Sequence, residues 1–116
     1  MLHHVRLELA RCHDFPNGNS DRGYELTLPL TKEGRLDAED WLHHRDQCRF
    51  RRFWDGDENA GAVKHDRRGW RLVFENQMED DEVIFRGDHH RFAPGEYISV
   101  NDPDGAMRTF RVAQIG

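Results

Sequence analysis

The stretch Val5-Arg6-Leu7-Glu8-Leu9, in which apolar and charged side chains alternate, decides the fold class. Successive side chains of a β-strand point to opposite faces of a sheet, so this period of two predicts a strand with one buried face. The same alternation recurs at Tyr24-Glu25-Leu26-Thr27-Leu28, where the apolar residues again share one face. The first quarter of the chain therefore predicts sheet rather than helix.

Turn-forming residues divide the rest of the chain into short runs of the same kind. Glycine, proline, asparagine and aspartate lie between these runs, as expected for loops between strands. Residues 55–59 are interpreted as one such turn, and Asp102-Pro103-Asp104-Gly105 as the turn of a C-terminal hairpin, because proline there fixes φ and glycine accepts positive φ. The predicted strands cover residues 3–10, 23–30, 48–54, 61–65, 70–75, 83–86, 96–100 and 107–115.

One short helix is expected over residues 37–47. Asp37 is a suitable N-cap, and the acidic residues of the first turn suit the helix dipole. Trp41 and Leu42 are expected to pack inward against the sheet. The predicted fold is mainly β: a small barrel or strongly bent antiparallel sheet of seven or eight strands with one short helix, in a single domain over residues 1–116.

Composition restricts the classes of partner. The 116 residues carry a formal net charge of −5, which argues against a general nucleic-acid binder, because such proteins neutralise phosphates with excess cations. No apolar run is long enough to span a membrane, and the first residues lack the apolar stretch of a secretory signal. The expectation is a cytoplasmic protein without membrane contact, in which Cys12 and Cys48 are most simply free thiols.

Several short segments carry a resemblance to known proteins. These segments are Leu9-Ala10-Arg11, Asp14-Phe15-Pro16, Arg22-Gly23-Tyr24-Glu25, Arg51-Arg52-Phe53-Trp54 and the region from Gly87-Asp88-His89 to Val100. Through them the chain resembles a group of short uncharacterised bacterial proteins, a likeness that implies no activity. The C-terminal hairpin, with residues 92–100 before its turn and residues 110–115 after it, resembles the closing hairpin of PUA-like barrels. That second resemblance implies a domain that binds RNA or modified nucleotides.

A basic aromatic stripe is the most distinctive candidate binding surface. Arginine and aromatic side chains together bind phosphates and bases, and they are also frequent in protein interfaces. In the alternative interpretation, Phe50 and Trp54 belong to the core, and the arginines answer Glu and Asp on neighbouring strands. The stripe consists of Arg45, Arg49, Arg51 and Arg52, interleaved with Phe50, Phe53 and Trp54.

Two further groups of residues suggest metal binding and acid–base catalysis. His44 and Cys48 lie four residues apart, and Cys12-His13 offers two more groups that bind zinc, although the spacing matches no known zinc motif. The alternative is surface histidines and two buried small thiols. Asp88 can orient His89 for acid–base work, but no nucleophile motif accompanies them.

The sequence thus favours a non-catalytic binding or interaction module with an unknown protein partner. A small metal-dependent or Asp/His-assisted enzyme is one alternative, and a PUA-like RNA or nucleotide binder is another. No catalytic residue, metal ligand or cofactor is assigned. The predicted binding residues are Arg49, Arg51, Arg52, Trp54, Asp88 and His89.

Overall fold

The computed structural model describes residues 1–75, 82–84, 90–102 and 105–116. Over these residues the chain forms one antiparallel sheet of eight strands in the order β6-β5-β4-β3-β2-β1-β8-β7. The strands are β1 (Leu2–Leu9), β2 (Asn19–Pro29), β3 (Arg49–Trp54), β4 (Asp57–Asp66), β5 (Gly69–Phe74), β6 (Glu82–Ile84), β7 (Tyr97–Asn101) and β8 (Met107–Ile115). The prediction of a mainly β fold is confirmed.

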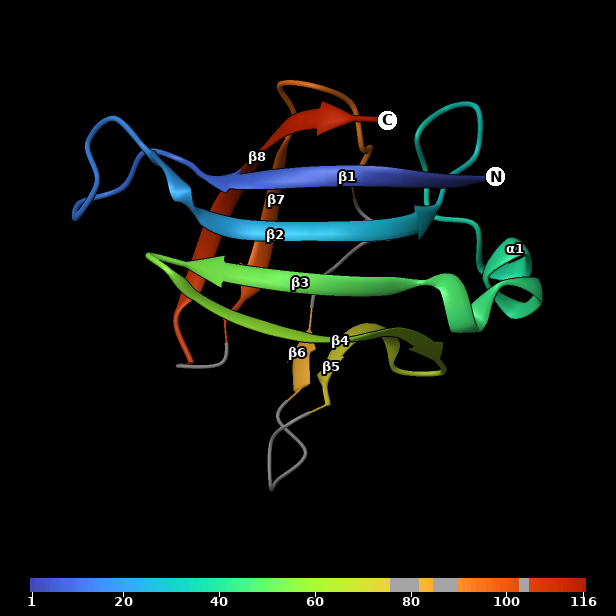
Figure 1. Ribbon diagram of the computed structural model, residues 1–116. Coiled ribbons are helices and arrows are strands. Elements are labelled where there is room, and N and C mark those ends of the chain that lie inside the picture. Colours follow the sequence, from blue (N-terminus) through green and yellow to red (C-terminus); the bar gives the residue numbers. More distant parts are fainter. Residues whose placement is uncertain (76–81, 85–89, 103–104) are drawn as a thin grey trace.

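The sheet is strongly bent into a half-barrel. In Figure 1, β1 to β4 run across the view, while β7 and β8 pass steeply behind them. The bend gives the sheet a concave inner face, and the apolar residues of the alternating runs all lie on it. Val5, Leu7, Tyr24, Leu26 and Leu28 are each no more than 2% exposed. Burying a large apolar side chain contributes about 1.5–3 kcal/mol, so the alternation that predicts the strands also supplies their stability.

The turn between β3 and β4 is shorter than predicted. Asp55 and Gly56 both have positive φ, 51° and 96°, and together they form the whole turn. Two positive φ angles make a type I′ turn, whose twist matches that of the flanking strands. The prediction of a turn over 55–59 is therefore wrong at its end, because β4 pairs with β3 from Asp57 onward.

The predicted helix is divided into two short pieces. The Asp37 side chain caps the first by accepting a hydrogen bond from the backbone N–H of Asp40 (3.1 Å). This first piece is the α-helix α1 (Ala38–His43), which ends at His43. The second piece is a 3₁₀ turn, η1 (Arg45–Gln47). Trp41 packs inward as predicted, whereas Leu42 is 58% exposed, so that expectation is wrong for Leu42. A helix of six residues presents only one side to the sheet, and Leu42 follows Trp41 by about 100° around the axis.

The C-terminal hairpin forms as predicted. Residues of β7 pair with β8 from Tyr97↔Arg111 to Asn101↔Met107. The backbone N–H of Asp102 donates to Ala106 O (2.9 Å), which closes the ladder at the turn. Pro103 and Asp104 of the predicted turn, and residues 85–86 of a predicted strand, lie outside the described residues.

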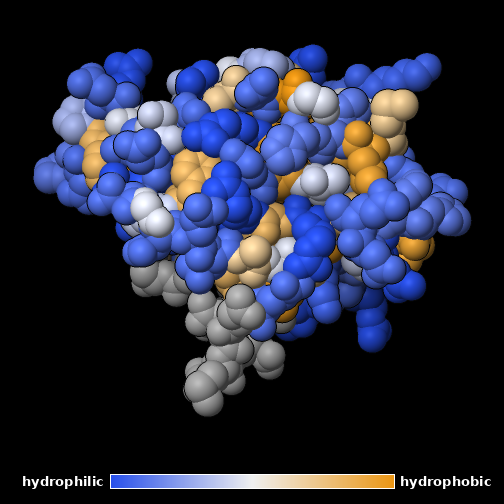
Figure 2. All heavy atoms as spheres, in the orientation of Figure 1, coloured by the Kyte–Doolittle hydropathy of each residue, from blue (hydrophilic) through white to orange (hydrophobic). Residues whose placement is uncertain are grey.

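The face of the molecule that Figure 2 draws is largely polar. Figure 2 shows a face dominated by hydrophilic residues, on which apolar residues appear only as small separate spots. Within the described ranges, no helix has the length and apolar character needed to cross a membrane.

Candidate binding surfaces

Strand β3 divides the basic aromatic stripe between the two faces of the sheet. Arg49, Arg51 and Phe53 alternate with Phe50 and Arg52, and only the second set points to the concave side. The stripe is therefore not one continuous surface. Trp54 lies on the inner face as well, partly buried against the core.

On the outer face, Arg51 belongs to a ladder of alternating charges. Its guanidinium contacts Glu25 Oε1 (3.0 Å) and also pairs with Glu58. Arg6 contacts the same Glu25 oxygen (2.6 Å) from the neighbouring strand. Glu8 extends the row, because it accepts from Arg6 (2.8 Å) and lies 3.9 Å from Arg111. This outer ladder, Arg111–Glu8–Arg6–Glu25–Arg51–Glu58, crosses β8, β1, β2, β3 and β4 in sheet order.

The ladder fixes the charge of its central carboxylate. Burial opposes ionisation of Glu25, but hydrogen bonds from Arg51 and Arg6 outweigh it, so the pKa of Glu25 lies below its ordinary value. The same two guanidiniums lie over the Phe53 ring, that of Arg6 4.4 Å and that of Arg51 5.4 Å from its centroid, and cover it from solvent. Arg49 is also engaged, in an ion pair with Glu75.

On the inner face, Arg52 reaches a buried carboxylate. The Asp102 side chain has no exposed surface and accepts from Arg52 Nη2 (2.9 Å), Arg108 Nη1 (2.9 Å) and the Tyr24 hydroxyl (2.5 Å). These four residues, from β2, β3, β8 and the end of β7, form the Asp102 cluster. A buried charge is tolerated only when it is paired and hydrogen-bonded, and the cluster meets both conditions.

Burial and neighbouring charges in the Asp102 cluster shift the pKa values of Tyr24 and Arg52. Burial, together with the negative charge of Asp102, raises the pKa of Tyr24 far above its ordinary value. Burial alone would lower the pKa of Arg52, but its bonds to Asp102 leave that pKa raised. The Trp54 ring lies beneath Arg52, with the guanidinium carbon 4.1 Å from the ring centroid. Arg52 and Trp54 therefore belong to an internal assembly rather than to an open surface.

The other sequence candidates give no assembled site. Asp88 and His89 lie outside the described residues. Both cysteines are free thiols, and Cys48 is buried, but Cys12 is exposed, so the expectation of two buried thiols is wrong for Cys12. Burial, with the nearby charge of Asp40, raises the pKa of Cys48 to about 11, which keeps this thiol protonated at neutral pH. In the part of the chain that the structure describes, no three His, Cys, Asp or Glu side chains are placed to hold a metal ion.

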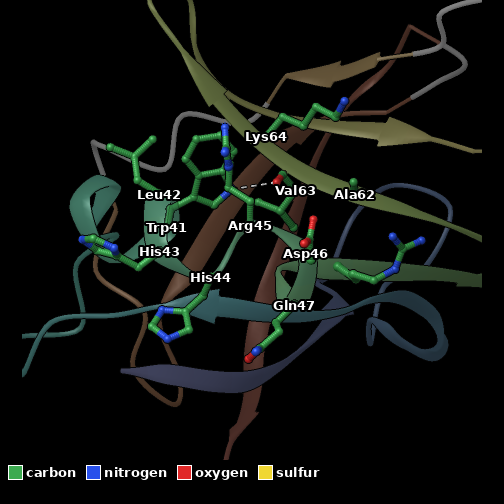
Figure 3. Close-up of a pocket in the computed structure, with 11 residues that line it drawn as sticks. Trp41, Leu42, His43, His44, Arg45, Asp46, Gln47, Ala62, Val63 and Lys64 are labelled. Carbon is green, nitrogen blue, oxygen red and sulfur yellow. Dashed lines mark hydrogen bonds between the residues drawn. The ribbon is translucent and has the colours of Figure 1, made fainter.

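A groove of about 640 Å³ lies between α1, η1 and β4 (Figure 3). Its size falls within the range of about 300–1,000 Å³ typical of ligand sites. Three cationic side chains line it, Arg45, Arg49 and Lys64, against a single carboxylate, Asp46. The full lining of this α1–β4 groove is Trp41, Leu42, His43, His44, Arg45, Asp46, Gln47, Arg49, Ala62, Val63 and Lys64.

Two of these cations differ from the arginines of β3. Among the described residues, neither Arg45 nor Lys64 has an ion-pair partner. Arg45 lies over the Trp41 ring instead, 5.8 Å from its centroid, and Trp41 is held in turn by a hydrogen bond from its indole N–H to Val63 O (2.9 Å; Figure 3). Arg45 was part of the predicted stripe, but Lys64 was missed, because only the fold brings β4 next to η1.

In comparisons with protein-family models, curated proteins and solved structures, no match to the chain was found, so the resemblances noted in the sequence stay predictions and the function has to be inferred from the geometry.

Proposed function

We propose that the protein is a non-catalytic binding module whose α1–β4 groove takes an anionic ligand. One observation carries this proposal: Arg45 and Lys64 line the same groove, and neither has an ion-pair partner among the described residues. The chain as a whole has a net charge of −5, whereas the groove holds Arg45 and Lys64 beside one carboxylate, Asp46, and its third cation, Arg49, is paired with Glu75. A ligand with negative charge is what such a groove attracts.

The chemistry of the lining supports binding rather than reaction. Arg45 and Lys64 can each donate charge-assisted hydrogen bonds to carboxylate or phosphate oxygens. His43 and His44 add imidazoles at the rim, and the groove lining contains no cysteine, serine or threonine that would serve as a nucleophile. We place this module in the cytoplasm, where free thiols such as Cys12 stay reduced.

The test is an NMR titration of the isotopically labelled protein with citrate and with inorganic phosphate. We expect the backbone amide signals of residues 42–48 and 62–64 to shift together as one saturable event. The double variant R45Q/K64Q should weaken this binding about tenfold, since each exposed charge contributes about 0.2–1 kcal/mol.

A matched control removes one lysine and one arginine elsewhere. Lys32 and Arg35 are exposed, lie outside the groove and have no ion pair among the described residues. K32Q/R35Q therefore changes the net charge equally and should leave binding intact. Absence of any saturable shift, or equal weakening by both double variants, would rule out the groove as the binding site.

A further inference from the structure

An exposed leucine lies on the rim of the α1–β4 groove. Leu42 is 58% exposed, although its neighbour Trp41 is almost fully buried. Figure 3 shows the two side chains on different sides of α1. A single exposed leucine is common on protein surfaces, but this one shares a groove with two cations that have no described ion-pair partner. The groove therefore offers an apolar contact beside its positive charges.

The groove does not offer a platform for a nucleobase. Single-stranded nucleic acids are held by aromatic rings on which bases stack. The only ring system in the lining besides the two imidazoles is Trp41, which is 8% exposed and packs edge-on against Trp70, with ring centroids 6.3 Å apart. Arg45 covers part of what remains. A polynucleotide backbone also needs an extended row of cations, whereas the neighbouring cation Arg49 is already paired with Glu75.

On the basis of the proposed anion-binding function, we propose that the natural occupant of the groove is an acidic segment of another protein that also carries an aliphatic side chain. Carboxylates of the segment pair with Arg45 and Lys64, and the aliphatic side chain packs against Leu42. The charge complementarity selects acidic segments, and the leucine selects among them. Asp46, the one carboxylate in the lining, repels acidic groups from its own position and so restricts where the segment can lie.

The experiment measures fluorescence anisotropy of three labelled probes with the intact protein. The first is a glutamate-rich peptide with a central leucine, the second is the same peptide with serine in place of that leucine, and the third is a single-stranded RNA of equal length. We expect the leucine peptide to bind most tightly, and its affinity to fall with added salt. L42S should weaken it about fivefold through lost apolar burial, and R45Q/K64Q about tenfold.

Each other outcome has a definite meaning. Equal affinity for the leucine and serine peptides, or no effect of L42S, overturns the peptide proposal, while anion binding by the groove stands if citrate still binds. Tighter binding of the RNA than of either peptide also overturns it. If neither citrate nor any probe binds, the proposed function itself fails. Leu42 is exposed, so the melting temperature of L42S should equal that of the unmodified protein, which separates lost contact from lost folding.

Discussion

Two arginines of β3, Arg51 and Arg52, and two cations of the α1–β4 groove, Arg45 and Lys64, have different roles. Arg51 is paired in the outer ladder with Glu25 and Glu58, and Arg52 is paired with Asp102 inside the half-barrel. Arg45 and Lys64 have no such partner among the described residues. A cation-rich stretch of sequence therefore does not mark a binding surface by itself. Cations that already have carboxylate partners stabilise the fold, and unpaired ones are available to a ligand.

The two paired regions also differ from each other, because one is buried and the other faces water. The Asp102 carboxylate has no exposed surface, while the side chains of the outer ladder are between 20% and 57% exposed. Removing one member of a buried ion pair leaves an uncompensated charge, whereas an exposed pair contributes little. Mutations in the two regions should therefore differ strongly in their effect on stability.

The largest effect is expected for Asp102→Ala. This change leaves Arg52, Arg108 and the Tyr24 hydroxyl without their shared acceptor. The free energy of unfolding should fall by about 3–5 kcal/mol, measured by urea denaturation. The control is Asp21→Ala, because Asp21 is exposed and its change should cost little. A similar loss of unfolding free energy for both variants would show that the buried ion pairs of Asp102 contribute no more than an exposed carboxylate.

The next effect is expected for Tyr24→Phe, which removes one hydrogen bond to a charged group. The cost should be about 1.5–3 kcal/mol at neutral pH. The pKa of Tyr24 is raised in the folded protein, so its un-ionised phenol contributes stability fully below the unfolded pKa and loses it as the pH rises above that value. Between pH 10 and 11 the unmodified protein should lose about 1 kcal/mol more than Y24F. If the free energies of unfolding of the two proteins fell in parallel over this pH range, the raised pKa of the buried Tyr24 phenol would be contradicted.

The smallest stability effect is expected for Glu25→Gln in the outer ladder. The cost should stay below about 1 kcal/mol and shrink further in high salt, which screens exposed charges. Because the folded pKa of Glu25 is lowered, its contribution is present above the unfolded pKa, near 4.3, and disappears as the pH falls through the folded value. The difference between E25Q and the unmodified protein should therefore vanish in acid, which a pH series of urea denaturation curves can measure.

The sequence predicts the fold well, because alternation at Val5–Leu9 and Tyr24–Leu28 is a local signal that both strands obey. It predicts less of the site. The partner of Arg52 is Asp102, which is 50 positions away and reads in the sequence as an ordinary turn residue. The prediction that Leu42 packs inward beside Trp41 is wrong, because a helix of six residues presents one side to the sheet and adjacent residues lie about 100° apart around its axis. The alternative interpretation of the stripe, arginines that answer Glu and Asp across strands, describes the outer ladder correctly.

The most direct test compares two single variants, Arg45→Gln and Arg51→Gln, in the citrate titration. Both remove one exposed guanidinium, but Arg51 is already paired with two carboxylates and Arg45 with none among the described residues. We expect R45Q to weaken citrate binding about threefold and R51Q to leave it unchanged. Equal weakening by both variants, or weakening by R51Q alone, would contradict anion binding by the groove cations that have no ion-pair partner among the described residues.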